Sequence, residues 1–246
     1  MTDKAGAGQI VAMGGGGFSM EPENLLLDRY VLGLVNRKQP RVCFVPTASG
    51  DAQSYIDRFL ASFGSLPCHP THLSLFNPPT ADLQSFVGEQ DVIYVGGGNT
   101  RNLLVLWREW GLDVILRDAW ERGAVLAGIS AGSICWFDEG VTDSILGRLT
   151  PLRCLGFLPG SNCPHYDGEP ERRPAYQHLV ANGELSPGYA ADDGVALHFA
   201  GTRLERIISS RPHARAYRLE RRGEGVEETA IVPQYLGTGG ETGGTK

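Results

Sequence analysis

The most constraining feature of this sequence is the alternation of short apolar runs with longer amphipathic stretches through its first half. Five runs are expected to be buried strands: 9–13, 41–45, 71–75, 91–95 and 124–129. Between them, four segments have the apolar spacing of helices: 24–37, 51–63, 99–110 and 113–122. Strands that alternate with helices form parallel βαβ units, and helices then cover both faces of the sheet. The sequence therefore predicts an α/β fold.

The pattern changes after residue 136. Residues 138–160 are short, glycine-punctuated segments that indicate a hairpin or an excursion beside an active site. A helix is expected at 172–181, followed by closely spaced, partly antiparallel strands at 188–191, 195–199, 204–209 and 216–219. No linker or repeat interrupts the chain, so we expect one domain over 1–236. The tail 237–246 has nothing to bury and is predicted to be disordered.

Charge and cysteine content exclude several classes of protein. The net charge of −6, from 22 basic and 28 acidic residues, gives no electrostatic support for nucleic-acid binding. Five cysteines without a C-x-x-C pair indicate reduced thiols rather than a disulfide framework. No run approaches the roughly 20 apolar residues that cross a bilayer, and the N-terminus lacks the apolar run of a signal peptide. These features predict a cytoplasmic protein that does not bind membranes.

The strongest local signal is the pentapeptide Gly128-Ile129-Ser130-Ala131-Gly132, a G-x-S-x-G at the end of an expected strand. A serine on a sharp strand-to-helix turn presents its hydroxyl above the sheet, and small neighbours allow the strand and helix to approach each other. The N–H group of Ala131 then points toward the same space and can donate to an oxyanion. The alternative interpretation is an ordinary tight turn.

A second signal is the glycine run of Val95-Gly96-Gly97-Gly98-Asn99-Thr100, also directly after an apolar strand. If this strand neighbours the strand before Ser130, Gly97 or Gly98 can supply a second oxyanion donor. The other interpretation is a turn in which Asn99 or Thr100 caps the next helix. Both interpretations can hold together. An earlier run, 14–17, does not match the G-x-G-x-x-G dinucleotide motif.

Three segments together resemble peptidase family S51, which includes peptidase E (aspartyl dipeptidase) and cyanophycinase. They are YVGGGNTRNLL, RGAVLAGISAGSICWF and PHYDG, in the order of the family. The resemblance extends over about 11–199 and is strongest between 94 and 137. It implies a three-layer α/β/α fold with a mainly parallel sheet, similar to class I glutamine amidotransferases (flavodoxin-like). It also implies a triad of serine, histidine and an acidic residue.

The resemblance assigns roles to individual residues. Ser130 matches the nucleophile, and His165 in the PHYDG segment matches the general base. In the segment ADDGVAL, Asp193 lies on the position of the family's glutamate, one methylene shorter, so Asp192 remains an alternative acid. Two aspartates before a glycine are also typical of a hairpin turn. The expected oxyanion donors are the N–H groups of Gly98 and Ala131.

Substrate selection is expected to involve arginine, because peptidase E recognises an N-terminal aspartate partly through arginine after its histidine. Arg172 and Arg173 are the candidates, although they follow His165 at a shorter spacing than in aspartyl dipeptidases. Their alternative role is solvated charge at a helix start. Further substrate contacts are expected from the glycine loop. The predicted substrate-binding residues are Gly97, Asn99, Thr100, Arg172 and Arg173.

The leading hypothesis is a serine exopeptidase that acts on short peptides, including Asp-X dipeptides. The alternatives are a cyanophycinase-like peptidase, a catalytically silent binding protein on the same scaffold, and an α/β-hydrolase-type esterase. The esterase would use Ser130 with Asp192 or Asp193 and with His198 or His213. No H-E-x-x-H is present and the histidines do not cluster at ligand spacing, so no metal or other cofactor is expected. A homodimer is among the assemblies that the sequence allows.

Overall fold

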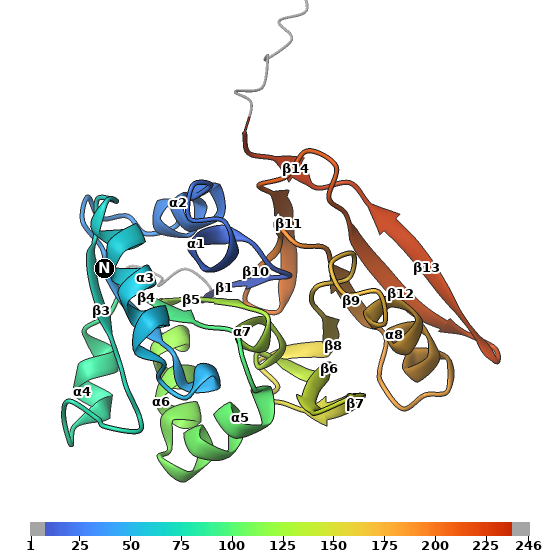
Figure 1. Cartoon of the computed structure of the whole chain (residues 1–246), viewed down its shortest axis with the longest axis horizontal. Coiled ribbons are helices and arrows are strands. Elements are labelled where there is room, and N and C mark those ends of the chain that lie inside the picture. The colour runs from blue at the N-terminus through green and yellow to red at the C-terminus, as the bar shows by residue number, and fades with distance from the viewer. Residues whose placement is uncertain (1–7, 238–246) are drawn as a thin grey trace, which may run out of the picture.

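The main sheet has eight strands, and its parallel half follows the expected βα alternation. The computed structural model describes residues 8–237, so the predicted tail lies outside the described residues except for Gly237. Five parallel strands lie side by side in the order β3-β2-β4-β5-β1 (Figure 1). They are β1 (Gln9–Met13), β2 (Arg41–Val45), β3 (His69–His72), β4 (Val92–Val95) and β5 (Val125–Ile129).

Three further strands extend the main sheet beyond β1. Strand β10 (Val195–Ala200) pairs antiparallel with β1, and β11 (Arg203–Ser209) pairs antiparallel with β10. The short β14 (Gln234–Tyr235) runs parallel to β11 at the edge. The sheet is therefore mixed, with a parallel half and a largely antiparallel edge.

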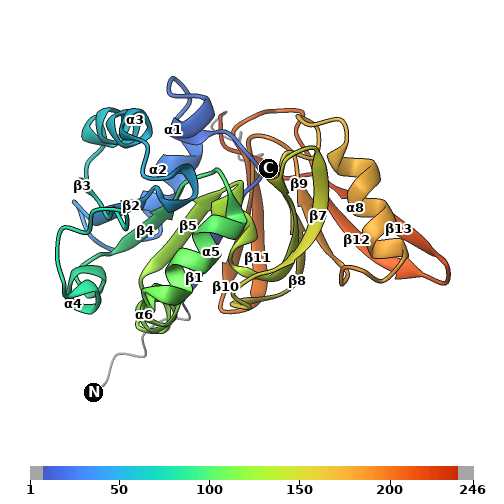
Figure 2. The ribbon, with the colours of Figure 1, turned by 60° about the horizontal axis from the view of Figure 1, so that its bottom comes forward.

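Helices cover both faces of the main sheet, as the alternation predicts (Figures 1 and 2). Successive residues of β1 show the two faces: Ile10 and Ala12 belong to one buried cluster, whereas Val11 and Met13 belong to the other. One face packs against α1 (Gly17–Met20), α2 (Leu26–Gly33) and α3 (Gln53–Gly64). The other packs against α4 (Leu83–Gly88), α5 (Thr100–Glu109), α6 (Leu112–Glu121) and α7 (Ala131–Ile134). The predicted three-layer α/β/α arrangement is confirmed.

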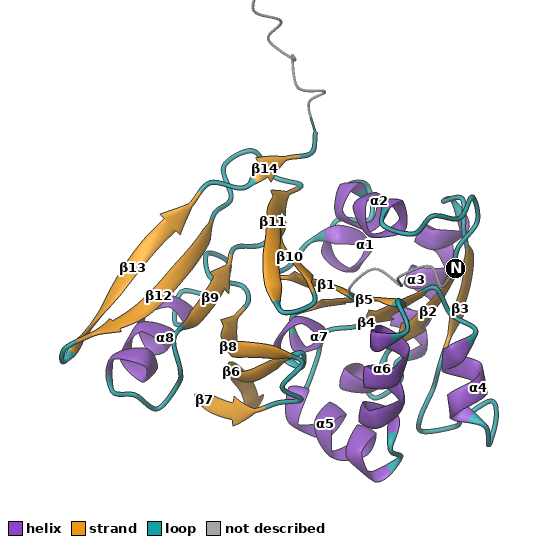
Figure 3. Cartoon of the chain, turned by 180° about the vertical axis from the view of Figure 1, so that it is seen from behind, coloured by secondary structure: helices purple, strands orange, loops and turns teal. Residues whose placement is uncertain are grey.

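A second sheet of six strands lies beside the first and was not indicated by the sequence (Figure 3). Its order is β13-β12-β9-β8-β6-β7, and α8 (Arg172–Ala181) packs against it. The hairpin expected in 138–160 is β6 paired with β7. The strands are β6 (Phe137–Ile145), β7 (Arg148–Arg153), β8 (Leu158–Cys163), β9 (Gly188–Ala191), β12 (Ala216–Arg222) and β13 (Gly225–Ile231).

Several element bounds differ from the sequence-based expectation. The helix expected at 24–37 ends at Gly33, although Leu34 and Val35 still pack against the core. A short 3-10 helix, η1 (Thr47–Ser49), follows β2. Strands β13 and β14 were not predicted. None of the helices between residues 8 and 237 has the length and apolarity needed to span a bilayer.

The carboxyl ends of the parallel strands position the candidate site residues. Strand β5 lies between β1 and β4, and the three strands run in the same direction. The expectation that the strand before the glycine run neighbours the strand before Ser130 is therefore confirmed. The loop 14–17, the loop 96–98 and Ser130 all leave the sheet at this edge, where ligands bind in open α/β sheets.

Candidate active site

Ser130 occupies a sharp turn between β5 and α7. Its backbone has φ 57° and ψ −115°, a conformation that is costly for a residue with a side chain. The flanking glycines allow the close approach: a Cβ on Gly128 would lie 2.1 Å from the carbonyl oxygen of Gly132. A Cβ on Gly132 would lie 2.3 Å from the carbonyl oxygen of Val95. The pentapeptide thus forms the strained turn that its sequence predicts.

His165 follows β8 in the second sheet and contacts Asp193. Its Nδ1 lies 2.7 Å from Asp193 Oδ1, and both side chains are largely buried, with 13% and 10% of their surface exposed. Its backbone also has a positive φ, 54°. A carboxylate at Nδ1 favours the tautomer that carries a proton on Nδ1, which leaves Nε2 free to accept one.

The side chain of Asp192 makes no hydrogen bond to His165 among the described residues. Its Oδ2 accepts a hydrogen bond of 2.8 Å from the N–H of Arg215, and its Oδ1 is buried without a partner among the described residues. Burial raises the pKa of Asp192 to about 6, with the N–H of Arg215 acting in the opposite direction. Of the two aspartates that the sequence left open, the structure brings Asp193 to His165.

The loop after β1 holds the histidine and the aspartate together. Gly14 accepts a hydrogen bond of 3.3 Å from the N–H of His165, and Gly15 accepts one of 2.9 Å from the N–H of Gly194. A Cβ on Gly14 would lie 2.3 Å from the carbonyl oxygen of Asp192, and one on Gly15 would lie 1.9 Å from Asp193 Oδ1. The sequence of this run, compared only with a dinucleotide motif, did not reveal this contact.

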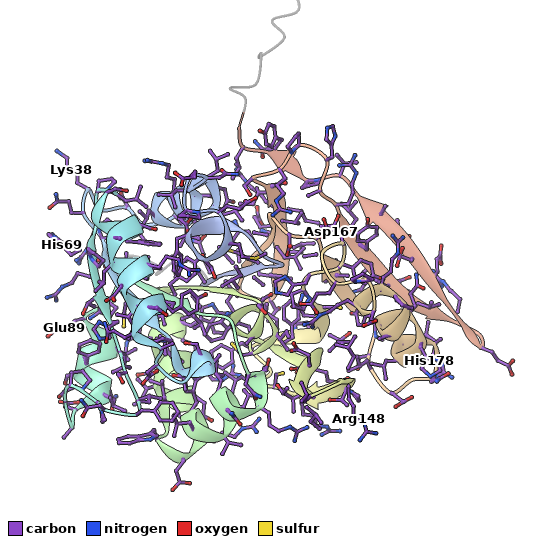
Figure 4. The ribbon with its side chains drawn as sticks, viewed as in Figure 1. Lys38, His69, Glu89, Arg148, Asp167 and His178 are labelled. Atoms are coloured by element: carbon purple, nitrogen blue, oxygen red, sulfur yellow. The ribbon has the colours of Figure 1, made fainter. Side chains whose placement is uncertain are left out.

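Asp167 also supports this loop system. Its Oδ1 accepts a hydrogen bond of 2.8 Å from the N–H of Asp193. Asp167 lies between the two sheets, whereas His69 and His178 lie at opposite ends of the molecule (Figure 4). Both histidines are exposed. They therefore take no part in this site.

Ser130 and His165 line the same pocket, which has a volume of about 280 Å³. No hydrogen bond joins their side chains in the part of the chain that the structure describes. The remaining lining residues come from α1, α3, the glycine loop and the end of β5. They are Ser19, Met20, Tyr55, Arg58, Gly97 and Ile129.

Only Gly97 of this lining group was expected at the site. Tyr55 and Arg58 are three positions apart on α3 and therefore share a helix face. That spacing is the available sequence signal for them, but it does not reveal which part of the fold this face meets.

The glycine loop beside Ser130 supplies backbone donors. The N–H of Gly97 donates to the hydroxyl of Tyr55 at 3.2 Å. The N–H groups of Gly98 and Ala131 have no protein acceptor among the described hydrogen bonds. Gly98 has φ 134°, and a Cβ there would lie 2.2 Å from the carbonyl oxygen of Ala48, so only glycine fits.

Asn99 and Thr100 adopt the capping alternative. The Oδ1 of Asn99 accepts a hydrogen bond of 3.0 Å from the N–H of Asn102 at the start of α5. The hydroxyl of Thr142 donates to that of Thr100 at 3.2 Å, and Thr100 is buried. Neither residue lines the pocket, so the structure does not bring these two expected substrate contacts to the site.

Arg172 and Arg173 also lie outside the pocket. Arg172 is 2% exposed, and its guanidinium donates to Glu169 at 2.6 Å and to the carbonyl of Val141 at 3.2 Å. Arg173 pairs with Glu228 and lies over the rings of Tyr166 and Tyr217. Because both guanidinium groups have partners within the fold, their placement does not match the expected role in binding a substrate carboxylate.

The two histidines of the esterase alternative are not at the site. His198 lies on β10, with Nδ1 2.8 Å from the hydroxyl of Tyr30 and Nε2 2.8 Å from Oε1 of Gln9. Both ring nitrogens are therefore occupied. His213 is exposed in the loop between β11 and β12. Of the candidate bases, His165 is the one that lines the pocket with Ser130.

Comparison with known proteins yields consistent matches. The family model described as "Peptidase family S51" matches residues 10–207. The chain is 64% identical over 229 residues to "Uncharacterized peptidase YgaJ" of Bacillus subtilis (strain 168), covering 93% of this chain and 99% of that protein. It is 30% identical over 134 residues to "Peptidase E" of Shewanella amazonensis, covering 50% of this chain and 57% of that protein.

Solved structures share the fold. A peptidase from an acI-B1 Actinobacterium superposes with a TM-score of 0.67 at 18% identity, covering 92% of this chain and 98% of the other. A putative peptidase E from Listeria monocytogenes superposes with a TM-score of 0.58 at 18% identity, covering 92% and 99%. The fold predicted from the sequence is therefore confirmed.

Proposed function

We propose that this chain, which belongs to peptidase family S51, is a serine-type exopeptidase acting on short peptides. The proposed triad is Ser130, His165 and Asp193. The observation that carries the proposal is the pocket that Ser130 shares with His165, together with the 2.7 Å contact between His165 and Asp193.

In the proposed mechanism, Asp193 accepts the Nδ1 proton of His165 in a hydrogen bond and orients the ring. Nε2 then removes the proton of the Ser130 hydroxyl as its oxygen attacks the scissile carbonyl. His165 gives that proton to the leaving amine, which departs and leaves an acyl-enzyme. Water attacks the ester with His165 again as base, and the proton returns to Ser130 as the acid product leaves.

The oxyanion of each tetrahedral intermediate is assigned to the N–H groups of Gly98 and Ala131. Both follow carboxyl ends of neighbouring parallel strands, and neither has a protein acceptor among the described residues. Donors that are already fixed in place stabilise the developing charge without reorganisation. Their lack of an internal partner supports this assignment.

Short substrates are supported by the size of the pocket. Its volume of about 280 Å³ lies just below the usual range of ligand pockets, roughly 300–1,000 Å³. The resemblance to peptidase E makes Asp-X dipeptides the first substrates to test. All five cysteines are free thiols, which supports a cytoplasmic location.

Labelling with a fluorophosphonate tests this function without knowledge of the peptide. We expect a single adduct on Ser130 by mass spectrometry, and none in Ser130→Ala. His165→Ala should lower the labelling rate at least about 10³-fold, since the base is lost. His178→Ala is the matched control, because His178 is exposed and does not line the pocket, and this variant should be labelled at the wild-type rate.

The same assay separates the alternatives. A catalytically silent scaffold would leave Ser130 unlabelled in the folded wild-type protein. An esterase that used another base would lose labelling in His213→Ala or His198→Ala and retain it in His165→Ala. Either result would contradict the proposed triad.

A further inference from the structure

Arg58 is the charged residue of the Ser130 pocket. It lies on α3, one turn after Tyr55, and its side chain lines the pocket with Ser130 and His165. The other lining residues are neutral, apart from His165 when it is protonated. The pocket therefore has a positive wall without a compensating carboxylate, which suits an anionic group.

Arg58 has no ion-pair partner between residues 8 and 237. None of the ion pairs among the described residues includes it. Its Nη1 donates a hydrogen bond of 2.8 Å to the carbonyl of Ser19. Because a guanidinium carries five N–H groups, the others remain available to a ligand. Arg172 and Arg173, by contrast, are both paired with carboxylates.

Hydrogen bonds connect Arg58 to the loop beside the nucleophile. Its acceptor Ser19 also makes a 2.6 Å hydrogen bond, through its hydroxyl, to the hydroxyl of Tyr55. Tyr55 in turn accepts the N–H of Gly97, and a Cβ on Gly97 would lie 3.2 Å from the Cβ of Ser130. The guanidinium is thus held at a defined distance from the reacting centre, and preorganisation of this kind reduces the entropy lost on binding.

We infer that Arg58 binds a carboxylate of the substrate and selects peptides that carry one close to the scissile bond. This inference rests on the proposed function and names the substrate class of the same pocket. A planar guanidinium can bind a carboxylate through two parallel hydrogen bonds. The apolar residues Met20 and Ile129 line the same space and suit the aliphatic part of the substrate.

The carboxylate can come from two parts of a short peptide. It is either the acidic side chain of the residue whose carbonyl is attacked, or the C-terminal carboxylate of a dipeptide. Three ligands distinguish them: Asp-Leu has both groups, Asn-Leu lacks the acidic side chain, and Asp-Leu amide lacks the C-terminal carboxylate.

Binding by calorimetry to the Ser130→Ala protein tests the inference, since no turnover then interferes. Adding the substitution Arg58→Gln should weaken the binding of Asp-Leu about 10- to 100-fold, because hydrogen bonds between charged groups are lost. Arg29→Gln is the matched control, because Arg29 is exposed on α2 and is absent from the described ion pairs. It should leave binding unchanged.

The ligand series identifies the source of the carboxylate. If Arg58 binds the acidic side chain, Arg58→Gln should weaken the binding of Asp-Leu and of Asp-Leu amide but not that of Asn-Leu. If Arg58 binds the C-terminal carboxylate, the same substitution should weaken the binding of Asp-Leu and of Asn-Leu but not that of Asp-Leu amide. Equal affinities with and without Arg58, or no binding of any of the three peptides, would overturn the inference.

These results are independent of the test of the proposed function. If Ser130 is labelled but peptide binding does not depend on Arg58, the inference is wrong and the peptidase mechanism is unaffected. Unlabelled Ser130 together with binding that depends on Arg58 would remove the mechanism and leave a carboxylate-binding pocket.

Discussion

Replacing Gly15 with alanine should disable the proposed triad without preventing folding. Gly15 lies just after β1, and a Cβ there would be 1.9 Å from Asp193 Oδ1 and 2.7 Å from its Cγ. The φ angle of Gly15 is outside the left-handed region, so alanine can adopt the same backbone conformation. The clash is with the end of a side chain, and the Asp193 carboxyl group can move to relieve it.

The size of that movement follows from the contact distances. Oδ1 must move from 1.9 Å to an ordinary contact of about 3.4 Å, a shift of about 1.5 Å, whereas its hydrogen bond to His165 is 2.7 Å long. A shift of this size breaks the bond or tilts the ring. Because loss of the orienting acid costs about 10⁴-fold in serine peptidases, we expect labelling to slow by about 10²- to 10⁴-fold.

The stability cost should be small by comparison. Losing a hydrogen bond to a charged group costs about 1.5–3 kcal/mol, which corresponds to a fall in the melting temperature of about 4–10 °C for a chain of this length. The assay is the second-order rate of fluorophosphonate labelling at a temperature where the variant is folded, as shown by circular dichroism.

Gly33→Ala is the control for the effect of an added methyl group. Gly33 ends α2, and a Cβ there would meet no atom within 4 Å. We expect its labelling rate to match the wild type and its stability to rise by up to about 1 kcal/mol. If folded Gly15→Ala were labelled at the wild-type rate, the Asp193 carboxylate would not be the group that orients His165.

Two further predictions concern the layer that supports the pocket. Burial raises the pKa of Asp28 to about 6, so ionisation of this carboxyl costs the folded state about 3 kcal/mol, and that cost appears as the pH rises from about 4 to 6. The free energy of unfolding of Asp28→Asn, measured with urea, should therefore rise relative to that of the wild type by about 2 kcal/mol between pH 4 and pH 7.5. A difference between the two proteins that does not change with pH would contradict the raised pKa. Tyr55→Phe removes the hydroxyl that accepts the N–H of Gly97 and should lower the free energy of unfolding by about 1–2 kcal/mol; an unchanged value would show that this hydrogen bond does not stabilise the fold.

Local sequence determined the layers and the turn that carries Ser130. The continuous apolar run of β1 and the amphipathic spacing of α3 depend on residues close together in the chain. They decide that β1 is buried on both faces and that α3 is buried on one. The turn at Ser130 is equally local, because it requires small residues on each side of one serine. Family resemblance added His165 and left Asp192 and Asp193 as alternative acids.

Tertiary structure decided the partners of these elements. The sequence indicated strands after residue 136, but strand pairing depends on contacts between distant segments, so the separate six-stranded sheet appeared only in the fold. For the same reason, the choice of Asp193 depends on the loop at Gly14 and Gly15, which meets it from 178 positions away at the Gly15–Asp193 bridge.

The residues that line the pocket also depend partly on local sequence and partly on tertiary packing. The helical spacing of Tyr55 and Arg58 places them on one face of α3, but only the packing of α3 and α1 beside the end of β5 turns that face toward Ser130. Arg172 and Arg173 were closer to the histidine in sequence, yet the fold pairs both with carboxylates. Short-range periodicity sets local conformation, whereas the chemistry of the pocket depends on which distant surfaces pack together.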